Sequence, residues 1–571
     1  MSNLSISGAE AVIRSLLAED VKTIFGYPGG AIMPIYDALY DFKEEVNHIL
    51  VRHEQGAIHA AQGFARACGK TGVVFATSGP GATNLITGLA DALIDSTPVV
   101  CITGQVASHL LGTDAFQETD VIGISMPVTK WNIQITKAKD IPAAIARAFY
   151  IASTGRPGPV LVDITKDAQF GKMDFDYSKC SSVRSYVPHP RMDHTQLEKA
   201  VEIINQAEKP YLLIGQGILL SEAENELIEF VEKSGIPVAS TLLGLGAFPA
   251  DHPNYVGYLG MHGNYAPNIL TNECDVLIAI GMRFDDRVTG DVSRYAKQAK
   301  VIHIDIDKAE LNKIIKADLA IHADAKEALS YMSSLILLKS HEVWLQEFRK
   351  LEHEEVQEVI LDAVNPKGHE LKMSEVVHLI SETTKGDAIV VTDVGQHQMI
   401  TSRYFKYQFP NSNITSGGLG TMGFALPAAI GAKLGVPRKE VIAIIGDGGF
   451  QMTIQELGTI LQAEIAVKIV ILNNNFLGMV RQWQQLFFDK RYSFTDIKNP
   501  NFLKIAEGYG IKGHKVTSRD KLQEGLNTML NCKESYLLEV MVEQEENVFP
   551  MLPTGASVSE IILSERHGAN I

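Results

Sequence analysis

The sequence is poor in cysteine, carries no excess of positive charge and has no long apolar run. Its five cysteines are odd in number and lack CxxC spacing, which argues against a disulfide framework and against a zinc site. Lys and Arg number 51 against 67 Asp and Glu, so the formal net charge is −16. An acidic chain without a basic cluster is a poor match for nucleic acid or for an anionic membrane surface.

Anchoring and targeting segments are also missing from the pattern. No apolar run reaches the roughly 18 residues that suggest a membrane-spanning helix. The N-terminal stretch MSNLSISGAEAVIRSLLAEDV lacks the basic and then apolar regions of a signal peptide and is typical of a domain's first helix. Together with the scattered cysteines, these features predict a cytoplasmic protein that binds neither membrane nor nucleic acid.

What the sequence does contain is a repeated alternation of short apolar runs and helical segments, joined by glycine turns. Its 571 residues, 46% of them apolar, suffice for about three or four domains. Repeated strand–helix units predict the α/β fold class with doubly wound parallel sheets. We expect three such domains, at residues 1–165, 191–340 and 368–571, with an irregular linker over 166–190 and a charged helical segment over 340–367.

The most informative stretch is VIAIIGDGGFQMTIQELGTILQAEIAVKIVILNNN, which forms a βαβ pattern. A buried strand at Val441–Ile445 meets the glycine turn Gly446–Gly449, and a second buried strand at Val467–Leu472 ends in three asparagines. Thr453 and Glu456 have the spacing of a capping box, so a helix is predicted from there to about residue 463. Ligands of open α/β sheets bind at the carboxyl ends of such strands.

Asp447 and Asn474 follow these two strands, and 24 residues (449–472) separate Gly448 from Asn473. A carboxylate and an amide oxygen beside glycine N–H groups suit Mg²⁺ together with phosphate oxygens. An ordinary turn with an aspartate helix cap is the alternative. The GDG and NN pairs at this interval resemble the diphosphate-binding motif of thiamin diphosphate enzymes. The resemblance implies that Asp447, Asn474 and the carbonyl of Phe476 hold the metal. It places cofactor contacts at Gly446, Gly448, Gly449, Phe450, Leu477, Gly478 and Met479.

A second motif is RHEQGA, in which Glu54 follows a strand and begins a helix rich in small residues. Tight, apolar surroundings make a hydrogen bond to such a carboxyl group strong, although a buried structural glutamate is the alternative. The motif resembles the segment of thiamin diphosphate enzymes whose glutamate bonds the aminopyrimidine ring of the cofactor and so activates it. The resemblance adds cofactor contacts at Tyr27, Pro28, Gly29, Thr77 and Asn84.

The segment GLGTMG at residues 418–423 matches GxGxxG, but the polar Asn411–Asn413 stands where a dinucleotide site would need a strong strand. It resembles instead the loop that supports the thiazolium end of thiamin diphosphate, with Gly420 in contact and Met422 as the apolar wedge that bends the cofactor. Core packing is the alternative for Met422. Gln396 and His397 resemble further diphosphate contacts, although a structural histidine is the alternative for His397.

Over nearly its whole length the chain resembles the catalytic subunits of acetolactate synthases. The segments that carry this resemblance are GYPGGAIMPIYDAL, TSGPGATN, LLGTDAFQE, RFDDRVTG and LGMVRQWQ. The resemblance implies three cofactors: thiamin diphosphate, Mg²⁺ and FAD. It assigns FAD contacts to Arg156, Gly215, Gly217, Thr241, Leu259, Met261, His262, Gly281, Arg283, Asp285, Arg287, Asp305, Ile306 and Asp324. For each charged residue of FDDR taken alone, a surface ion pair is the alternative to an FAD contact.

The implied reaction is decarboxylation of pyruvate and condensation of the remaining two-carbon unit with a second pyruvate or with 2-oxobutyrate. Besides Glu54, the resemblance places Gln117 and Lys130 on the substrate side. It places Arg287 at the carboxylate of the second substrate. Trp483 and Met479 resemble the apolar wall that favours 2-oxobutyrate over pyruvate as that second substrate. It further implies active sites shared between subunits of a homodimer or homotetramer, and a small regulatory subunit as partner.

Three other functions are alternatives to this one. A flavin-using pyruvate oxidase of the same superfamily is the nearest, but RFDDRVTG and RQWQ favour the synthase. A glyoxylate carboligase would lack the glutamate present here as Glu54. A nucleotide-binding regulatory protein would keep the glycine loops and need neither Glu54 nor the pair of Asp447 and Asn474.

Overall fold

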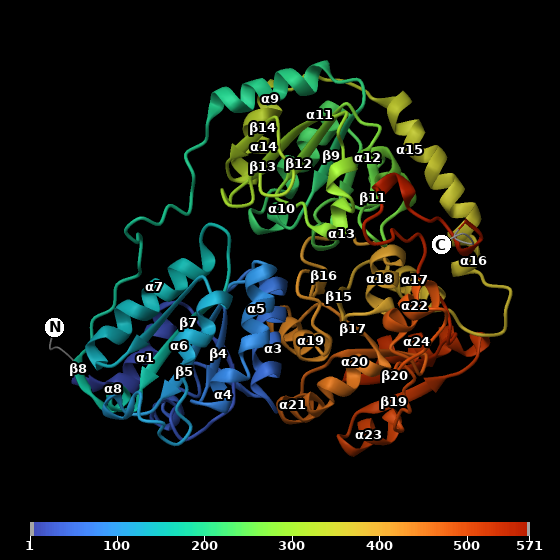
Figure 1. Cartoon of the computed structure of the whole chain (residues 1–571). Helices are drawn as coiled ribbons and strands as arrows, with labels where there is room; N and C mark the ends of the chain where they lie inside the picture. The colour runs from blue at the N-terminus through green and yellow to red at the C-terminus, as the bar shows by residue number, and fades with distance from the viewer. Residues whose placement is uncertain (1–4, 568–571) are drawn as a thin grey trace.

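The computed structural model describes residues 5–567, so the first and last four residues of the expected terminal domains lie outside the described part. Figure 1 shows three α/β units arranged around a common centre, with each sheet flanked by helices. Each unit contains a six-stranded sheet in which all strand pairs are parallel. The expectation of three doubly wound parallel-sheet domains is therefore confirmed.

The first domain is built on the strand order β3-β2-β4-β5-β7-β6. These strands are β2 (Thr23–Gly26), β3 (Asn47–Leu50), β4 (Gly72–Ala76), β5 (Val99–Gln105), β6 (Trp131–Ile135) and β7 (Val160–Thr165). Its helices are α1 (Gly8–Ala18), α2 (Met33–Tyr40), α3 (Glu54–Cys68), α4 (Pro80–Thr83), α5 (Ile86–Ile94), α6 (Val121–Ser125), α7 (Ile141–Ser153) and α8 (Lys166–Phe170). An antiparallel pair of β1 (Ser5–Ser7) and β8 (Lys172–Asp174) continues the ordered structure into the segment expected to be a linker.

The middle domain has the strand order β11-β10-β9-β12-β13-β14. These strands are β9 (Pro210–Ile214), β10 (Val238–Ser240), β11 (Tyr255–Tyr258), β12 (Val276–Ile280), β13 (Lys300–Asp305) and β14 (Leu319–His322). The helices are α9 (His194–Gln206), α10 (Gly217–Leu220), α11 (Glu224–Ser234), α12 (Tyr265–Thr271), α13 (Asp286–Thr289) and α14 (Ala325–Leu335). The predicted charged helix follows as α15 (Glu342–Glu355), a π-helical turn (Val356–Ile360) and α16 (Leu361–Val364).

The third domain has the strand order β16-β15-β17-β18-β20-β19. These strands are β15 (Ile389–Thr392), β16 (Asn413–Thr415), β17 (Val441–Gly446), β18 (Lys468–Asn473), β19 (Lys512–Val516) and β20 (Tyr536–Met541). The helices are α17 (Met373–Thr384), α18 (Gln396–Tyr404), α19 (Ala425–Gly435), α20 (Asp447–Met452), α21 (Leu457–Ala463), α22 (Gly478–Phe487), α23 (Phe502–Gly508) and α24 (Leu522–Asn531). Strands β17 and β18 are neighbours, with Gly446 opposite Leu472, so the turns that follow them lie side by side.

The predicted capping box at Thr453 is wrong. Thr453 makes no side-chain cap to the short 3₁₀ turn Ile454–Glu456 that follows it. The predicted helix itself is present, because this turn continues as α21, which ends at Ala463, and α20 is an additional short helix directly after β17. The Glu456 carboxylate instead accepts hydrogen bonds from the Arg52 amide of the first domain, at 3.1 and 3.2 Å, and from Thr459. A contact between domains has therefore replaced the local cap.

Helices α3 and α19 bring the first and third domains of one chain into close contact. A Cβ at Gly431 would lie 1.7 Å from the Ala60 carbonyl oxygen, and one at Gly63 would lie 1.9 Å from that of Ala428. Only glycine allows the two backbones to approach this closely. Among residues 5–567, no helix is long and apolar enough to cross a membrane.

Candidate active site

The buried Asp447 begins α20 at the carboxyl edge of the third sheet, beside the asparagines that end β18. Its carboxylate accepts a hydrogen bond from Asn499 Nδ2 at 2.6 Å, and the same nitrogen donates to Asn473 Oδ1 and to Asn475 Oδ1, each at 3.1 Å. Asn499 thus ties the two turns together. Nothing in the local pattern indicates Asn499, which lies 52 residues from Asp447 in the sequence.

The chemistry of this corner fits a divalent cation. Burial raises the pKa of Asp447 to about 6, partly offset by the Asn499 hydrogen bond, and the carboxylate is surrounded by amides and not by a basic side chain. Within the described residues no cluster of three or more His, Cys, Asp or Glu could hold a metal. A cation here would therefore rest on Asp447 together with amide and main-chain oxygens, the ligands that Mg²⁺ accepts.

Three buried side-chain atoms beside this corner lack a hydrogen-bond partner: Gln396 Oε1, His397 Nε2 and Asn474 Nδ2. A Cβ at Gly478 would lie 2.1 Å from Gln396 Oε1 and 2.8 Å from Asn474 Nδ2. His397 lies against Gly395 and Gly446, whose Cβ positions are 2.8 Å from its Cε1 atom. Unsatisfied buried polar atoms call for an explanation, and a polar group such as a diphosphate fits these surroundings.

Burial lowers the pKa of His397 to about 4, so this histidine is neutral at physiological pH. Met422 and Leu477 face the same glycine turn: a Cβ at Gly448 would lie 3.8 Å from Met422 Cε and 2.7 Å from Leu477 Cδ2. The side chain of Phe450 instead points into the core, where it packs edge-on against Phe502 with ring centroids 5.4 Å apart. Only the main chain of Phe450 is available to a cofactor.

A second cluster lies at the carboxyl edge of the first sheet, around Glu54. Glu54 begins α3, is 8% exposed, and accepts a hydrogen bond from Asn84 Nδ2 at 2.9 Å. A Cβ at Gly81 would lie 3.2 Å from Glu54 Oε1 and 2.8 Å from Thr77 Cγ2, while one at Gly29 would lie 2.5 Å from Thr77 Cβ. The structure thus brings Glu54, Thr77, Asn84 and Gly29 together.

The remaining predicted residues of this cluster follow the same edge. Tyr27 and Pro28 continue from β2, and Tyr27 is 42% exposed. Gln117 adopts a left-handed backbone, with φ of 60°, and a Cβ at Gly79 would lie 2.8 Å from the Gln117 carbonyl oxygen. This edge of the first domain is therefore partly exposed.

A cavity of about 990 Å³ lies where the three domains meet. Its lining contains every residue that the sequence resemblance assigns to FAD except Gly215, and also Gly420, Met422, Met479 and Trp483. Gly215 lies behind the lining, where its Cβ would be 2.3 Å from the Gly281 carbonyl oxygen. The absence of a side chain at Gly215 lets the two strand ends pack closely.

Charged side chains from the first and middle domains line this cavity. Arg156 bridges the first and middle domains through ion pairs with Asp307 at 3.1 Å and Glu310 at 2.8 Å. Burial raises the pKa of Asp305 to about 7. Asp285 and Asp324 use their carboxylates as helix caps of α13 and α14, so those oxygens are engaged locally.

The two predicted catalytic side chains with a positive charge, Lys130 and Arg287, differ in their relation to the cavity. Lys130 does not line the cavity; its ammonium group donates to the carbonyl oxygens of Ile151 and Thr154 and to the Tyr186 hydroxyl group. Burial lowers the pKa of Lys130 to about 8. Arg287 lies on the cavity wall with its side chain 60% exposed.

Within one chain, the structure therefore holds two separate clusters. The first-domain cluster, around Glu54, lies outside the lining of the cavity, while the third-domain turns with Gly420, Met422 and Trp483 contribute to it. A glycine turn with buried polar side chains on one α/β domain and a buried glutamate on another are features of a class of cofactor-dependent α/β enzymes. The glutamate and the turn belong to separate domains.

Comparison with known proteins narrows this class. Residues 6–124 match the thiamine pyrophosphate enzyme N-terminal TPP binding domain. Residues 197–332 match the central domain of these enzymes, and residues 393–540 match their C-terminal TPP binding domain.

Individual relatives extend along the whole chain. The acetolactate synthase isozyme 2 large subunit of Escherichia coli is 48% identical over 98% of this chain and 99% of its own length. The probable acetolactate synthase large subunit of Methanocaldococcus jannaschii is 47% identical over 98% of this chain and 95% of its own length. The acetolactate synthase large subunit of Lactococcus lactis is 45% identical over 97% of this chain and 96% of its own length. The chain belongs to the thiamine pyrophosphate enzymes, in the family of acetolactate synthase large subunits.

Proposed function

We propose that this chain is the catalytic subunit of an acetolactate synthase. It would convert two pyruvate molecules into 2-acetolactate and CO₂, or pyruvate and 2-oxobutyrate into 2-aceto-2-hydroxybutyrate and CO₂, the first common step in making branched-chain amino acids. The observation that carries the proposal is the end-to-end match, over 97–98% of the chain, to relatives with this name. The two polar clusters described above, around Glu54 and around Asp447, support the proposal.

We assign Mg²⁺ and the cofactor diphosphate to the third-domain corner. Asp447, Asn474 and the Phe476 carbonyl would hold the metal, while Gln396, His397 and the glycine turns would contact the diphosphate. Bound thiamin diphosphate supplies the carbon nucleophile and the electron sink for decarboxylation. Met422 would press on the cofactor from its apolar side, because its Sδ–Cε end faces the Gly448 turn.

Glu54 is assigned to the aminopyrimidine ring of the cofactor. Its carboxyl group is almost buried and has Asn84 as a fixed hydrogen-bond donor, so it is oriented before the cofactor binds. A proton shared between Glu54 and the ring would prepare the cofactor for attack, as general acid–base catalysis requires.

FAD is assigned to the cavity between the domains. Its volume of about 990 Å³ is at the upper end of the range for ligand sites, about 300–1,000 Å³. The net reaction transfers no electrons to an acceptor, so FAD would have a structural role. Arg287 and Trp483 lie on the same wall; a guanidinium fork suits the carboxylate of the second 2-oxo acid.

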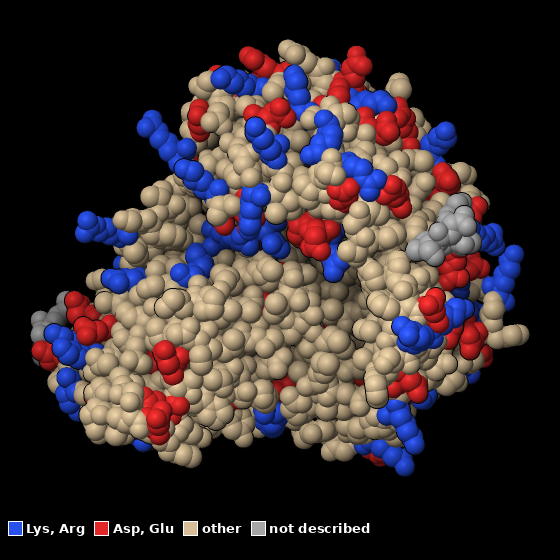
Figure 2. Space-filling view, viewed as in Figure 1, with Lys and Arg blue, Asp and Glu red and all other residues tan. Residues whose placement is uncertain are grey.

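We infer that the two clusters meet across subunits of a homodimer or homotetramer. Both carry exposed apolar side chains: Tyr27 is 42% exposed, Phe116 88% and Leu419 43%. Figure 2 shows that most of the visible face of the first and third domains is uncharged, whereas charged side chains gather over the middle domain. A second copy of the chain would cover such a surface.

Two further assignments follow from the relatives and the composition. The relatives are named large subunits, so a small regulatory subunit is the expected partner. The cysteines of the described residues are all free thiols, which suits a cytoplasmic protein.

The product identifies the reaction. Purified protein would be incubated with pyruvate, Mg²⁺, thiamin diphosphate and FAD, then acidified and assayed for acetoin, with an oxygen electrode running in parallel. Acetoin without oxygen uptake, lost on omission of Mg²⁺ and thiamin diphosphate, is the expected result. Oxygen uptake with acetate or acetyl phosphate would identify a pyruvate oxidase instead.

A further inference from the structure

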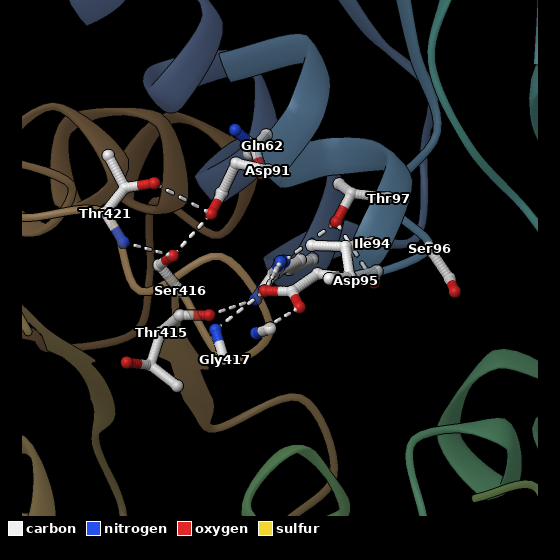
Figure 3. A network of polar contacts seen from close by, with 12 residues as sticks. Gln62, Asp91, Ile94, Asp95, Ser96, Thr97, Thr415, Ser416, Gly417 and Thr421 are labelled. Atoms are coloured by element: carbon white, nitrogen blue, oxygen red, sulfur yellow. Dashed lines mark hydrogen bonds and ion pairs between the residues drawn. The ribbon is translucent and has the colours of Figure 1, made fainter. Parts of the chain in front are cut away.

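A buried polar network joins the first and third domains of the same chain (Figure 3). Helix α5 of the first domain contributes Asp91, and Asp95 follows at its C-terminal end. Both side chains are fully buried. Both face the turn of residues 416–422, which follows β16 in the third domain.

Asp95 has the contacts of an ionised carboxylate. It accepts hydrogen bonds from the amides of Gly417 and Gly418, each at 2.7 Å, and from Arg66 Nη2 at 2.9 Å. Arg66 also donates to the Thr415 carbonyl oxygen. A Cβ at Gly418 would lie 2.8 Å from Ile94 Cγ1, so the turn is seated against α5.

Asp91 is bonded on one oxygen only. Its Oδ1 accepts hydrogen bonds from the Ser416 hydroxyl group and from Thr421 Oγ1, the latter at 3.2 Å. Ser416 Oγ in turn accepts from the Thr421 amide at 2.8 Å. Asp91 Oδ2 is buried and has no hydrogen-bond donor.

Gln62 Oε1, on α3, is a second buried acceptor without a donor. The amide nitrogen of Gln62 donates to the carbonyl oxygen of Gly88, one helical turn before Asp91 on α5, at 3.3 Å. This contact places the end of the Gln62 side chain on the part of α5 that carries Asp91 (Figure 3). Two neighbouring acceptors without a donor can both be satisfied by one proton between them.

The surrounding charges favour that proton. The charged and titratable groups around Asp91 are Asp95, Arg66 and His59. Arg66 is paired with Asp95, and His59 is neutral, since burial and then Arg66 lower its pKa to about 3. An ionised Asp91 would therefore be a buried charge without a countercharge, which is costly.

We propose that Asp91 carries a proton, which it donates to Gln62 Oε1, while Asp95 is ionised, and that this mixed pair positions the 416–422 turn over the cofactor site of its own chain. Asp91 and Asp95 are positioning residues and touch neither cofactor nor substrate. The assignment of the turn to the cofactor rests on the proposed function.

The turn links this pair to the cavity wall. Gly418, Gly420 and Met422 of the turn line the cavity. Its far end is fixed by Asp393, which accepts from the amides of Gly423 and Ala425 at 3.0 Å. The near end is held by the pair on α5 and by Gln398, whose Nε2 donates to the Ser416 carbonyl oxygen at 3.0 Å. Loss of the pair would therefore loosen the turn at Gly417 and Gly418, whose amides have Asp95 as their acceptor.

The acidity of Asp91 agrees with this geometry. Burial, and then the carboxylate of Asp95, raise the pKa of Asp91 to about 6. A hydrogen bond donated by the neutral form raises the pKa of a carboxyl group further. Gln62 Oε1 provides such an acceptor.

The same substitution at the two aspartates has opposite expected results. Asp91→Asn replaces O–H by N–H and keeps the Oδ1 acceptor, so binding of thiamin diphosphate with Mg²⁺ should stay within about threefold of wild type, because no buried group loses its partner. Asp95→Asn puts a donor against the donors of Arg66 and the glycine amides and should weaken binding at least about tenfold. Asp37→Asn, on the exposed side of α2, controls for the loss of charge. If Asp95→Asn does not fold, Ser416→Ala is the milder variant, with a weakening of several-fold expected.

Two measurements do not depend on cofactor or activity. The infrared difference spectrum between wild type and Asp91→Asn at pH 5, below the pKa of Asp91, should contain a protonated carboxyl C=O band. Hydrogen exchange at the Gly417 and Gly418 amides should be faster in Asp95→Asn than in Asp37→Asn. A missing band, or an Asp91→Asn variant that binds as poorly as Asp95→Asn, would overturn the protonated state in favour of an ionised Asp91 with the Gln62 amide turned to donate.

Unchanged exchange at these amides in Asp95→Asn would overturn the positioning role. Failure of wild type to bind thiamin diphosphate would count against the proposed function alone, because the infrared and exchange results would still decide the state of the pair.

Discussion

Asn499 donates a hydrogen bond to Asp447 across 52 residues of sequence, with 2.6 Å between Asn499 Nδ2 and Asp447 Oδ2. The same nitrogen reaches the asparagines at the end of β18. One amide therefore holds the two turns that we assign to the metal. Groups that orient metal ligands in this way affect metal affinity almost as strongly as the ligands do.

Asn499→Ala should weaken Mg²⁺ binding by about 10- to 100-fold, the usual effect of losing such a partner. Titration of apo-protein with Mg²⁺ at saturating thiamin diphosphate measures it. Asn531→Ala, at the exposed end of α24, is the matched control. Equal Mg²⁺ affinities for the two variants would remove Asn499 from the site.

Glu54→Gln should retain cofactor binding and lose most of the rate, by about 10²- to 10⁴-fold if the carboxyl group acts as an acid–base catalyst. The amide keeps the size of the side chain but cannot exchange a proton with the cofactor. Steady-state kcat and the thiamin diphosphate Kd should be measured together, with exposed Glu44→Gln as control. Turnover at the wild-type rate would exclude Glu54 from the mechanism.

Mixing Glu54→Gln with Asp447→Asn tests whether the two clusters meet between subunits. Each variant alone should be inactive. After dissociation and reassociation, half of the sites in a mixed dimer would carry neither substitution, so about a quarter of wild-type activity should return for random pairing in a two-fold symmetric dimer. No recovery would place both clusters in one chain's own site.

The raised pKa of Asp91 predicts how stability depends on pH. A carboxyl group whose pKa is higher in the folded than in the unfolded chain stabilises the fold when protonated, and that stability is lost as pH rises through the folded pKa. With a pKa of about 6 for Asp91 in the folded chain and about 3.9 in the unfolded chain, the Tm of Asp91→Asn relative to wild type should rise from about pH 4 to about pH 6 and level off above that. A difference that does not change with pH would mean that Asp91 does not titrate there.

The ion pair between Glu355 and Arg403 joins the helix after the middle domain to the third domain, with both side chains 1% exposed. Removing one partner of a buried pair costs about 3–5 kcal/mol. Glu355→Gln or Arg403→Met should therefore lower Tm sharply, and the double variant should lose less than the sum of the two. Glu534→Gln, from the exposed pair with Lys512, should have no measurable effect. Additive losses would show that the two side chains are not coupled.

The parts that the sequence predicted well are those that depend on neighbours in the chain. The βαβ unit at residues 441–475 places Asp447 and Asn474 at adjacent strand ends because parallel strands that are sequence neighbours pair in register. Glu54 follows in the same way from a strand, a turn and a helix rich in small residues.

The parts that it missed depend on contacts between domains. Glu456 has the spacing of a local cap but bonds Arg52 of another domain, and Lys130 is held by carbonyl groups that no short motif indicates. The hydrogen-bond partners of three further residues also come from distant segments of the chain: Asn499, Asp91 and Asp95. The periodicity of a sequence indicates local helices and strands, and it carries no information on contacts between distant segments.

The most direct test of the function is the stoichiometry of decarboxylation. Pyruvate consumed and CO₂ released should be measured in the same reaction, with Mg²⁺, thiamin diphosphate and FAD present and oxygen excluded. An acetolactate synthase releases one CO₂ for every two pyruvate molecules and leaves 2-acetolactate as the product. One CO₂ for each pyruvate, or a reaction that stops without oxygen, would contradict the account.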